Sequence, residues 1–436
     1  MGPLPAIMPR ACHAPPRLRH AAGPGHRLPS TPMTWQDPTP EIDALLPALR
    51  AIRHDIHRHP ELGFEEVRTQ ALVRAFLEAR GYRPWAAAGT GLVADLHPDR
   101  HGRAPTIALR ADLDALPIHE TTDIPHRSVH EGRSHKCGHD GHTSILLGVA
   151  DLLARHRDRI PGNVRLLFQP AEEGVRGGGA RVMVAEGVLQ GVAEVYGLHN
   201  WPAFPRGDVR VRPGPMMAQV HHMYITVRGK GGHGSQPHLC RDPIVAGAHL
   251  VTALQTIVAR GLGHDGGAVV SVTAFQAGNT HNVIPERARL MGTIRTFDPA
   301  ITERVLAHLR QIVDGSARTF GVALDLEIEE GYPVVVNHPV CAAAVERVAR
   351  RLLGEERVRG DGVPMATGED FAYFARAIPG AYFFIGAGSP GEDTPVCHHP
   401  DFDFDDAILP TGVAIFLGLV RDRMDALARG DDRPGS

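Results

Sequence analysis

The stretch Leu166-Leu-Phe-Gln-Pro-Ala-Glu-Glu-Gly174 joins a short apolar run, which begins at Val164, to two adjacent carboxylates. A run of this length is typical of a buried strand. Similar runs lie at 91–96, 106–109 and 194–198, and apolar residues at helical spacing cover 41–80 and 143–153. Strands separated by helices predict an α/β sheet that helices cover on both faces.

A second pattern begins near Val209. The spacing predicts strands at 222–228, 269–275, 290–297 and 323–329, and helices at 243–260 and 301–320. This β-α-β-β-α-β order defines a ferredoxin-like domain. Helix–strand alternation resumes after Tyr332, with a buried strand at 381–385, so we expect an insertion (213–330) that splits a catalytic domain into 37–212 and 331–428.

The chain ends are expected to be disordered over 1–36 and 429–436. The first 32 residues are rich in Pro, Arg and His and contain no Asp or Glu, so they cannot bury enough apolar surface to order themselves. Met33 is an alternative start, and a transit peptide is the competing interpretation of this acid-free segment.

Composition excludes several classes of protein. A chain of 436 residues exceeds one ordinary core, which favours two domains. A net charge of -3 gives no field that would gather nucleic acid or an anionic membrane, so we expect a small-molecule partner. Five cysteines do not form a dense, even framework of disulfides, which favours the reducing cytoplasm. No apolar run is expected to reach the length of a membrane span.

The densest chemical signal is His135-Lys-Cys-Gly-His-Asp-Gly-His142. Cys137 and His139 are close enough in sequence to bind one ion, and thiolate and imidazole suit zinc-type cations. The alternative is a capped helix start with polar decoration. The chain has only two lysines, Lys136 within this segment and Lys230. Every other Lys or Arg position is Arg.

Acids and histidines also follow the predicted strands. Adjacent carboxylates at Glu172 and Glu173 repel each other unless a cation neutralises them, and one can ligate while its neighbour works on a water. An exposed acidic turn is the alternative. His199 follows the run at 194–198, and His398 and His399 follow a turn. Ligands bind beyond the carboxyl ends of strands in such sheets, so these clusters are expected to meet.

Seven segments together resemble a known family. They are His57-Arg-His-Pro-Glu-Leu-Gly-Phe-Glu-Glu66, Leu109-Arg-Ala-Asp-Leu-Asp-Ala-Leu-Pro117, Cys137-Gly-His-Asp-Gly-His142, Phe168-Gln-Pro-Ala-Glu-Glu-Gly174, Gly229-Lys-Gly-Gly-His-Gly234, His281-Asn-Val-Ile-Pro-Glu286 and Thr367-Gly-Glu-Asp-Phe371. From about residue 41 to 424 the chain resembles the amidohydrolase branch of the metallopeptidases that include hippurate hydrolase, aminoacylase, carboxypeptidase G and plant auxin-conjugate hydrolases.

The resemblance implies a zinc-exopeptidase-like (phosphorylase-like) sheet with an inserted lid and dimerisation domain, and two divalent ions, zinc or manganese, with nickel or cobalt as alternatives. The implied ligands are Cys137, His139, Glu173, His199 and His398. Cys137 stands where peptidase relatives place a bridging Asp, and His399 is an alternative to His398. Peptidase relatives also carry a His two residues before the motif Asp, whereas this chain has Arg110 before Asp112.

The resemblance also implies roles for the remaining residues. Glu172 is the general base for a metal-activated water, and His233 stabilises the oxyanion, often from a partner subunit, which implies a homodimer. The glycine-rich segment around His233 does not have the Walker spacing of a phosphate-binding loop. Asn282 and Arg295 are candidates for the substrate carboxylate, although Arg295 could equally be a surface residue. Asp112 is expected to orient the ligands.

The expected function is therefore hydrolysis of the amide bond of N-acyl amino acids, such as hippurate-like, N-acetyl or aryl-acetyl compounds. A dipeptidase or aminopeptidase with the same two-metal centre is the nearest alternative, and Arg110 argues against it. A metal-binding regulatory protein without activity is the second alternative, but it would lack the base or a ligand.

Overall fold

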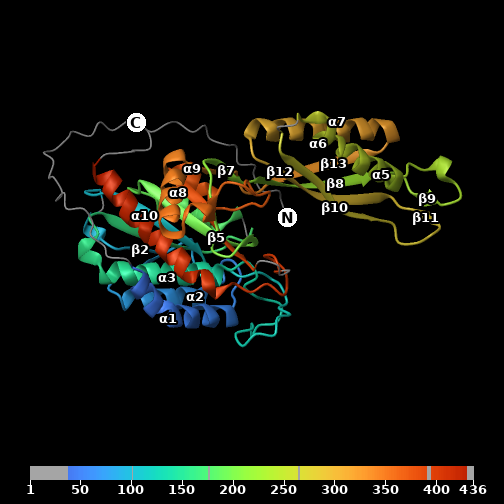
Figure 1. Ribbon diagram of the computed structural model, residues 1–436. Coiled ribbons are helices and arrows are strands. Elements are labelled where there is room, and N and C mark those ends of the chain that lie inside the picture. The colour runs from blue at the N-terminus through green and yellow to red at the C-terminus, as the bar shows by residue number, and fades with distance from the viewer. Residues whose placement is uncertain (1–37, 101, 175–176, 264–265, 390–393, 430–436) are drawn as a thin grey trace, which may run out of the picture. The chain divides into compact units, whose positions relative to one another are not determined.

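The computed structural model describes residues 38–429 except 101, 175–176, 264–265 and 390–393. The extension expected over 1–36, the possible start at Met33 and residues 430–436 of the expected tail lie outside the described residues. Figure 1 shows a large helix-covered sheet and a second, smaller sheet with its own helices.

The large sheet has eight strands, and its centre is parallel. In spatial order the strands are β1 (Trp85–Ala87), β2 (Gly91–Asp95), β4 (Asn163–Gln169), β3 (Thr106–Asp112), β5 (Glu194–Pro205), β16 (Gly380–Gly388), β6 (Val209–Arg210) and β15 (Val358–Arg359). Neighbours β4, β3, β5 and β16 run parallel. All residues of β3, β4 and β16 are buried, as expected of strands covered on both faces.

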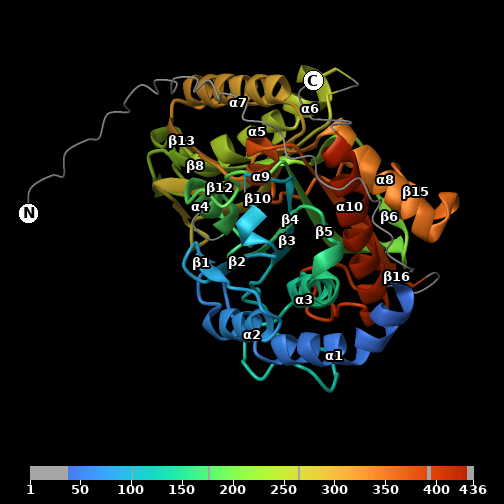
Figure 2. The same ribbon diagram turned by 90° about the vertical axis from the view of Figure 1, so that its left-hand side faces the viewer.

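Helices cover both faces of this sheet, which confirms the expected α/β class. The core of one face includes side chains of α1 (Thr39–Arg58), α3 (His139–Arg155), α8 (Pro339–Leu353) and α10 (Leu409–Arg429), and α2 (Val67–Glu78) packs there too. The core of the other face includes α4 (Gly179–Ala185) and α9 (Ala372–Ala377). Figure 2 shows α1, α3 and α10 on the same side of the sheet.

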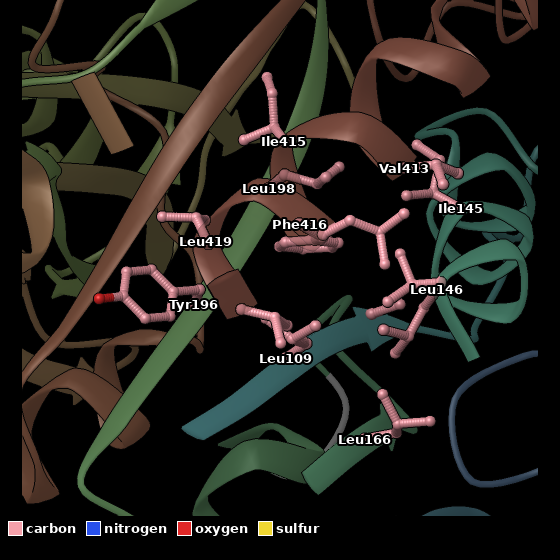
Figure 3. Packing of buried hydrophobic residues seen from close by; sticks show 14 of the residues in the cluster. Leu109, Ile145, Leu146, Leu166, Tyr196, Leu198, Val413, Ile415, Phe416 and Leu419 are labelled. Atoms are coloured by element: carbon pink, nitrogen blue, oxygen red, sulfur yellow. The ribbon is translucent and has the colours of Figure 1, made fainter. Parts of the chain in front are cut away.

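The packing of the first face is mostly apolar, with a buried ion pair between Arg423 of α10 and Glu194 of β5. Figure 3 shows Phe416 and Leu419 of α10 facing Leu198 and Tyr196 of β5, with Leu146 of α3 nearby. These side chains are excluded from water, so their burial is a main source of stability for the edge that carries the polar clusters.

The smaller sheet is antiparallel, in the order β10 (Ala268–Ala277), β12 (Arg287–Thr296), β8 (Gln219–Arg228) and β13 (Ala323–Glu330). Helices α5 (Pro243–Leu254), α6 (Thr256–Gly261) and α7 (Pro299–Phe320) bury apolar side chains against it. Along the chain the order is β-α-β-β-α-β, if α5 and α6 are taken together. Two-stranded sheets pair β9 (Gly232–His233) with β11 (Val283–Ile284) and β7 (Gly214–Met217) with β14 (Val335–Asn337).

The single helix expected over 243–260 is interrupted at Gln255. The hydroxyl of Thr256 donates to the carbonyl of Ala253, and the Gln255 amide bonds to Thr252, three residues back rather than four. A hydroxyl that bonds to a nearby carbonyl competes with the helical pattern, which accounts for the interruption.

The same stretch corrects the expectation about membrane spans. By length and composition alone, Pro243–Gly261 could cross a membrane, and 28% of it is buried inside the structure. Buried Leu250, Leu254 and Ile257 pack against the four-stranded sheet. Helices that pack in a protein core pass the same test, so this is weak evidence for a membrane segment.

Candidate metal centre

The candidate site lies at the carboxyl ends of the parallel strands. The register pairs Asp112, the last residue of β3, with Gln169, the last of β4, and the Glu172–Glu173 turn follows directly. His199 lies on the neighbouring strand β5, and α3 begins at His139. Segments that are distant in sequence therefore meet at one edge of the sheet, as the strand pattern predicts.

Gly138 allows the start of α3 to approach β5 closely. It has a left-handed backbone, with φ at 97°. A Cβ atom built at this position would lie 2.2 Å from Oδ1 of Asn200. Because only glycine fits here without strain, the Cys-Gly-His sequence can bring Cys137 and His139 against His199.

Backbone carbonyls orient two of the imidazoles. Nδ1 of His139 donates to the carbonyl of Asp114 at 2.9 Å, and Nδ1 of His199 donates to the carbonyl of Asn200 at 2.6 Å. A carbonyl only accepts, so in the neutral rings the proton is on Nδ1 and each Nε2 carries a lone pair; Nε2 of His199 lies 3.3 Å from Sγ of Cys137. Hydrogen bonds of this kind orient histidines that bind metals.

The Nε2 atoms converge with other possible metal ligands. The ligand atoms of Cys137, His139 and His199 lie within 4.8 Å of one another, and so do those of Cys137, Glu173 and His398. Cys137 is common to both groups. Nε2 of His139 and Oε1 of Glu173 are buried, lie 3.9 Å apart, and have no hydrogen-bond partner among the described residues. Thiolate, imidazole and carboxylate ligands fit divalent ions of the zinc type, so these residues suit two such ions.

The turn that carries the two glutamates is held on both sides. Asp114 accepts the backbone amides of Glu172 and Glu173, at 3.0 Å and 2.9 Å. The hydroxyl of Tyr332 donates to the Glu172 carbonyl and accepts the amide of Gly174 at 2.7 Å. Ala171, before the pair, has a positive φ of 52°. The turn is therefore fixed by the fold, although its backbone conformation is unusual for alanine.

Negative charge accumulates around Glu172. Burial raises its pKa well above the usual range, and the carboxylates of Glu369 and Glu173 add to the shift. Burial alone would lower the pKa of His139, but Asp112 and Asp114 raise it to about 10. Burial lowers the pKa of His199, and the nearby His142 adds to that effect. A buried group of acids is costly without cations, which is a second reason why these residues suit metal ions.

Asp112 does not face the cluster as a free ligand. Its Oδ1 is 2.7 Å from Nδ1 of His142, and its Oδ2 accepts from Arg110 at 2.6 Å, while Nε2 of His139 lies 3.8 Å away. The fully buried Arg110 also donates to Gln169 and Glu369. Arg110 therefore forms ion pairs with Asp112 and Glu369 behind the ligand cluster.

A cavity of about 490 Å³ opens over the cluster. Its lining includes Cys137, Glu172, Glu173, His199 and His398 on one side, and Arg295 and His222 of the smaller sheet on the other. Burial lowers the pKa of Arg295, which is half buried. His399 does not line this cavity, and its Nδ1 accepts the amide of Asp401 at 3.1 Å, so the geometry favours His398 over His399.

The structure does not bring His233 and Asn282 to the cavity. Neither lines it, and both are exposed. His233 lies in β9, which pairs with β11 beyond one end of α5 (Figure 1). The Ser235 amide donates to Nδ1 of His233 at 3.1 Å. The neutral ring therefore carries its proton on the exposed Nε2, which makes that atom a hydrogen-bond donor.

Sequence reasoning missed several residues of the site. Tyr332 lies where the chain returns from the smaller sheet, and no motif indicated that its hydroxyl holds the glutamate turn. Glu369 lines the cavity and accepts from Arg110. The Thr-Gly-Glu-Asp motif by itself assigns no role to Glu369. Asn200 directly follows His199, and that proximity was the available signal for it.

A second His and Asp group does not suit a metal. His57, His126 and Asp403 also lie close enough to share an ion. However, Nη2 of Arg53 is 2.8 Å from Nε2 of His126, and Nη1 of Arg53 is 2.9 Å from Asp403. The guanidinium already supplies the positive charge that a metal would bring.

Comparison with known proteins agrees with this geometry. Residues 108–422 match the family model "Peptidase family M20/M25/M40". The chain is 39% identical over 370 residues to the N-acetylcysteine deacetylase of Bacillus subtilis (strain 168), covering 84% of this chain and 94% of that protein. It is 37% identical to the IAA-amino acid hydrolase ILR1-like 4 of Arabidopsis thaliana, covering 84% of each.

A solved structure has the same fold. The Bacillus subtilis YXEP protein, described as a dinuclear metal binding peptidase from the M20 family, superposes with a TM-score of 0.72 at 35% identity, over 87% of this chain and 98% of that one. The match extends over most of both chains. The segments that carry the candidate ligands lie within residues 108–422, which the family model matches. The chain belongs to peptidase family M20/M25/M40 and is a hydrolase that acts on amide bonds.

Proposed function

We propose that this protein hydrolyses N-acyl amino acids to a carboxylate and a free amino acid, with two divalent ions, zinc or manganese first and nickel or cobalt as alternatives, bound by Cys137, His139, Glu173, His199 and His398. The observation that carries the proposal is the convergence of two ligand groups on Cys137, beside the buried Glu172, in one cavity. The named relatives that act on acylated amino acids support the same substrate class.

Glu172 has the position and environment of a general base. It lines the cavity, and its Oε2 lies 4.0 Å from Nε2 of His139. Bound divalent ions would polarise the amide carbonyl and acidify the attacking water. Glu172 then accepts a proton from that water and delivers it to the leaving amine. The buried carboxylate of Glu172 lines the cavity, so it can exchange a proton with a molecule bound there.

Arg295 is the proposed anchor of the substrate carboxylate. It lines the cavity from β12, with Nη1 3.6 Å from the position of a Cβ built on Gly368. A guanidinium offers paired donors that match a carboxylate. Such an anchor would select amides that bear a free carboxylate on the amino-acid side.

The exposed site residues point to a homodimer. We assign 37–212 and 331–428 to the catalytic domain, and 213–330 to an inserted lid and dimerisation domain. Strand β10 is an edge of the smaller sheet, and Val269 and Phe275 on it are exposed, as are Ile244 and Val245 on α5. An unpaired edge with apolar neighbours is suited to pairing with a second copy. In that dimer the partner subunit's His233 and the partner subunit's Asn282 would complete the cavity.

A reducing compartment, the cytoplasm, suits this assignment. The four cysteines of the described chain are free, and Cys137 is shared by both ligand groups. Oxidation of that thiol would remove a ligand from both ions, so we place the enzyme where thiols stay reduced.

The test is a substrate panel with metal-stripped enzyme, with and without added zinc or manganese. The panel contains hippurate, N-acetyl amino acids, indole-acetyl amino acids, free dipeptides and an N-acyl amine without a carboxylate. We expect metal to restore cleavage of the acylated amino acids alone. Turnover of dipeptides alone would instead assign the protein to the peptidase alternative, and no metal-dependent turnover would favour a binding protein.

A further inference from the structure

One of the two lysines is entirely buried next to a proposed ligand. Lys136 has no exposed surface, and it directly precedes Cys137. Lysine is seldom fully buried without a partner, because removing its charge from water is costly. The chain otherwise uses Arg for positive charge, so the ammonium group at this position calls for a specific reason.

The ammonium group joins two loops. Nζ of Lys136 donates to Oε1 of Glu120 at 2.7 Å, to the carbonyl of Phe402 at 2.7 Å and to the hydroxyl of Thr122 at 3.3 Å. Ammonium offers three donors, and these three acceptors use all of them. Glu120 is itself held by the Ser128 amide at 2.7 Å.

The backbone of Lys136 makes a further tie to the same region. Its carbonyl accepts the amide of His398 at 2.6 Å. Lys136 therefore contacts the 396–404 loop at two points, at His398 through its carbonyl and at Phe402 through its side chain. The loop has other ties as well, since the Thr121 amide donates to Pro400 at 3.2 Å and Arg53 bonds to Asp403. The ties of Lys136 lie next to Cys137, where Sγ of Cys397 also contacts the Cys137 carbonyl at 3.9 Å.

The side chain of His398 has one ionic contact among the described residues, between Nε2 and Oε1 of Glu173 at 3.2 Å, and its backbone lies in a loop. Its side chain is 53% exposed, its φ is 70°, and its loop contains no helix or strand at this point. Residues other than glycine adopt positive φ only where the surroundings impose it. By contrast, His139 starts a helix and His199 lies within a strand.

We infer that Lys136 is a positioning residue that ties the His398 loop to Cys137 and thereby sets the metal affinity of the Cys137–Glu173–His398 group. The inference rests on the proposed two-metal centre. Residues behind metal ligands typically change affinity by about 10–100-fold when they are replaced. The Cys137–His139–His199 group, which is supported by α3 and β5, should be affected much less.

The test is metal binding by the Lys136→Met variant, measured by competition with a chelator of known affinity and by metal analysis. Methionine keeps the length and apolar stem of lysine but donates no hydrogen bond. We expect the ion assigned to Cys137–Glu173–His398 to lose roughly 10–100-fold in affinity while the other ion changes little. With cobalt as the probe, the thiolate-to-cobalt absorption of the retained ion should persist. Lys230→Met is the matched control, because the Lys230 side chain is exposed. This variant should bind both ions as the unmodified chain does.

A second variant guards against misfolding. Lys136→Met leaves the buried Glu120 without one partner, so Lys136→Met/Glu120→Gln removes both charges together. Circular dichroism and thermal melting of the metal-free chains report whether each variant folds. Unchanged affinity for both ions in a folded variant would overturn the inference, and so would equal weakening of both, which indicates a general structural role.

The failure of the proposed function would look different. If the unmodified protein binds two ions but cleaves no N-acyl amino acid, the substrate assignment is wrong. The metal affinities of Lys136→Met would then still test the role of Lys136. If the unmodified protein binds fewer than two ions, both fail.

Discussion

The Cys137 cluster and the His233 segment differ in how the chain holds them. Cys137, His139 and His199 are buried, and the two imidazoles donate to backbone carbonyls that fix their orientation. His233 is exposed in a two-residue strand, and its contact with Ser235 leaves Nε2 facing outward. The first group is oriented by its own chain, whereas the second needs another surface to face. The motifs at the end of the large sheet meet within one chain, whereas His233 and Asn282 do not line the cavity that they form.

The strongest test of the buried half of this comparison is Cys137→Ala. Cys137 belongs to both ligand groups, so its loss should abolish binding of both ions and reduce turnover below detection. His398→Ala, which removes a ligand from one group, should cost only one ion. Metal analysis after dialysis against buffered zinc measures both. Two ions retained by Cys137→Ala would show that Cys137 does not link the groups.

The exposed half is tested by mixing two inactive variants. Loss of a donor to the oxyanion costs about 10²–10³-fold in kcat, so His233→Ala should be nearly inactive. Co-expressed with Glu172→Gln under separate affinity tags, it should form heterodimers in which one cavity has both groups intact. Such a dimer should recover roughly half of the unmodified activity. A purified heterodimer without recovery would place His233 in the cavity of its own chain.

Arg295 links the two regions, because it lies on β12 of the smaller sheet and also lines the cavity. A charge-assisted hydrogen bond is worth about 1.5–3 kcal/mol, so Arg295→Met should raise KM for N-acyl amino acids about 10–100-fold. Hydrolysis of an N-acyl amine without a carboxylate should change little. Steady-state kinetics on both substrates give the comparison, and an equal loss on both would remove Arg295 from carboxylate binding.

The smallest expected effect concerns the support beneath the buried ligands. His57 contacts Asp140 at 2.8 Å and Glu120 at 3.1 Å. Burial alone would lower the pKa of His57, but these two partners raise it to about 9. A raised folded-state pKa adds stability that is complete below about pH 6.5 and disappears as the pH rises through about 9.

The melting temperature of the unmodified protein should therefore fall by a few degrees more than that of His57→Gln between pH 6.5 and pH 9.5. Calorimetry across this range compares the two proteins. Parallel pH profiles would show that His57 is not charged in the folded state.

The sequence predicts the features that depend on local patterns, but not those that depend on contacts between distant residues. Strand periodicity and the Cys-Gly-His and Glu-Glu motifs were enough to predict the helix-covered α/β sheet and the edge where Cys137, Glu172 and His199 meet. Periodicity is local, so it could not show that the Tyr332 hydroxyl holds the glutamate turn, because that contact joins residues 160 positions apart. Periodicity also could not show that the Lys136 ammonium group donates to the Phe402 carbonyl. It could not show that a helix with a continuous apolar pattern is interrupted at Gln255. Such contacts depend on tertiary packing.

The central claim is that Glu172 acts as a base beside two ions that its neighbours hold. The most direct measurement is the metal content and turnover of Glu172→Gln, with Glu173→Gln as the adjacent, isosteric control. We predict that Glu172→Gln binds two ions but loses about 10²–10⁴-fold in kcat on an N-acetyl amino acid, whereas Glu173→Gln loses an ion. Turnover by Glu172→Gln near that of the unmodified enzyme, with both ions bound, would contradict the account.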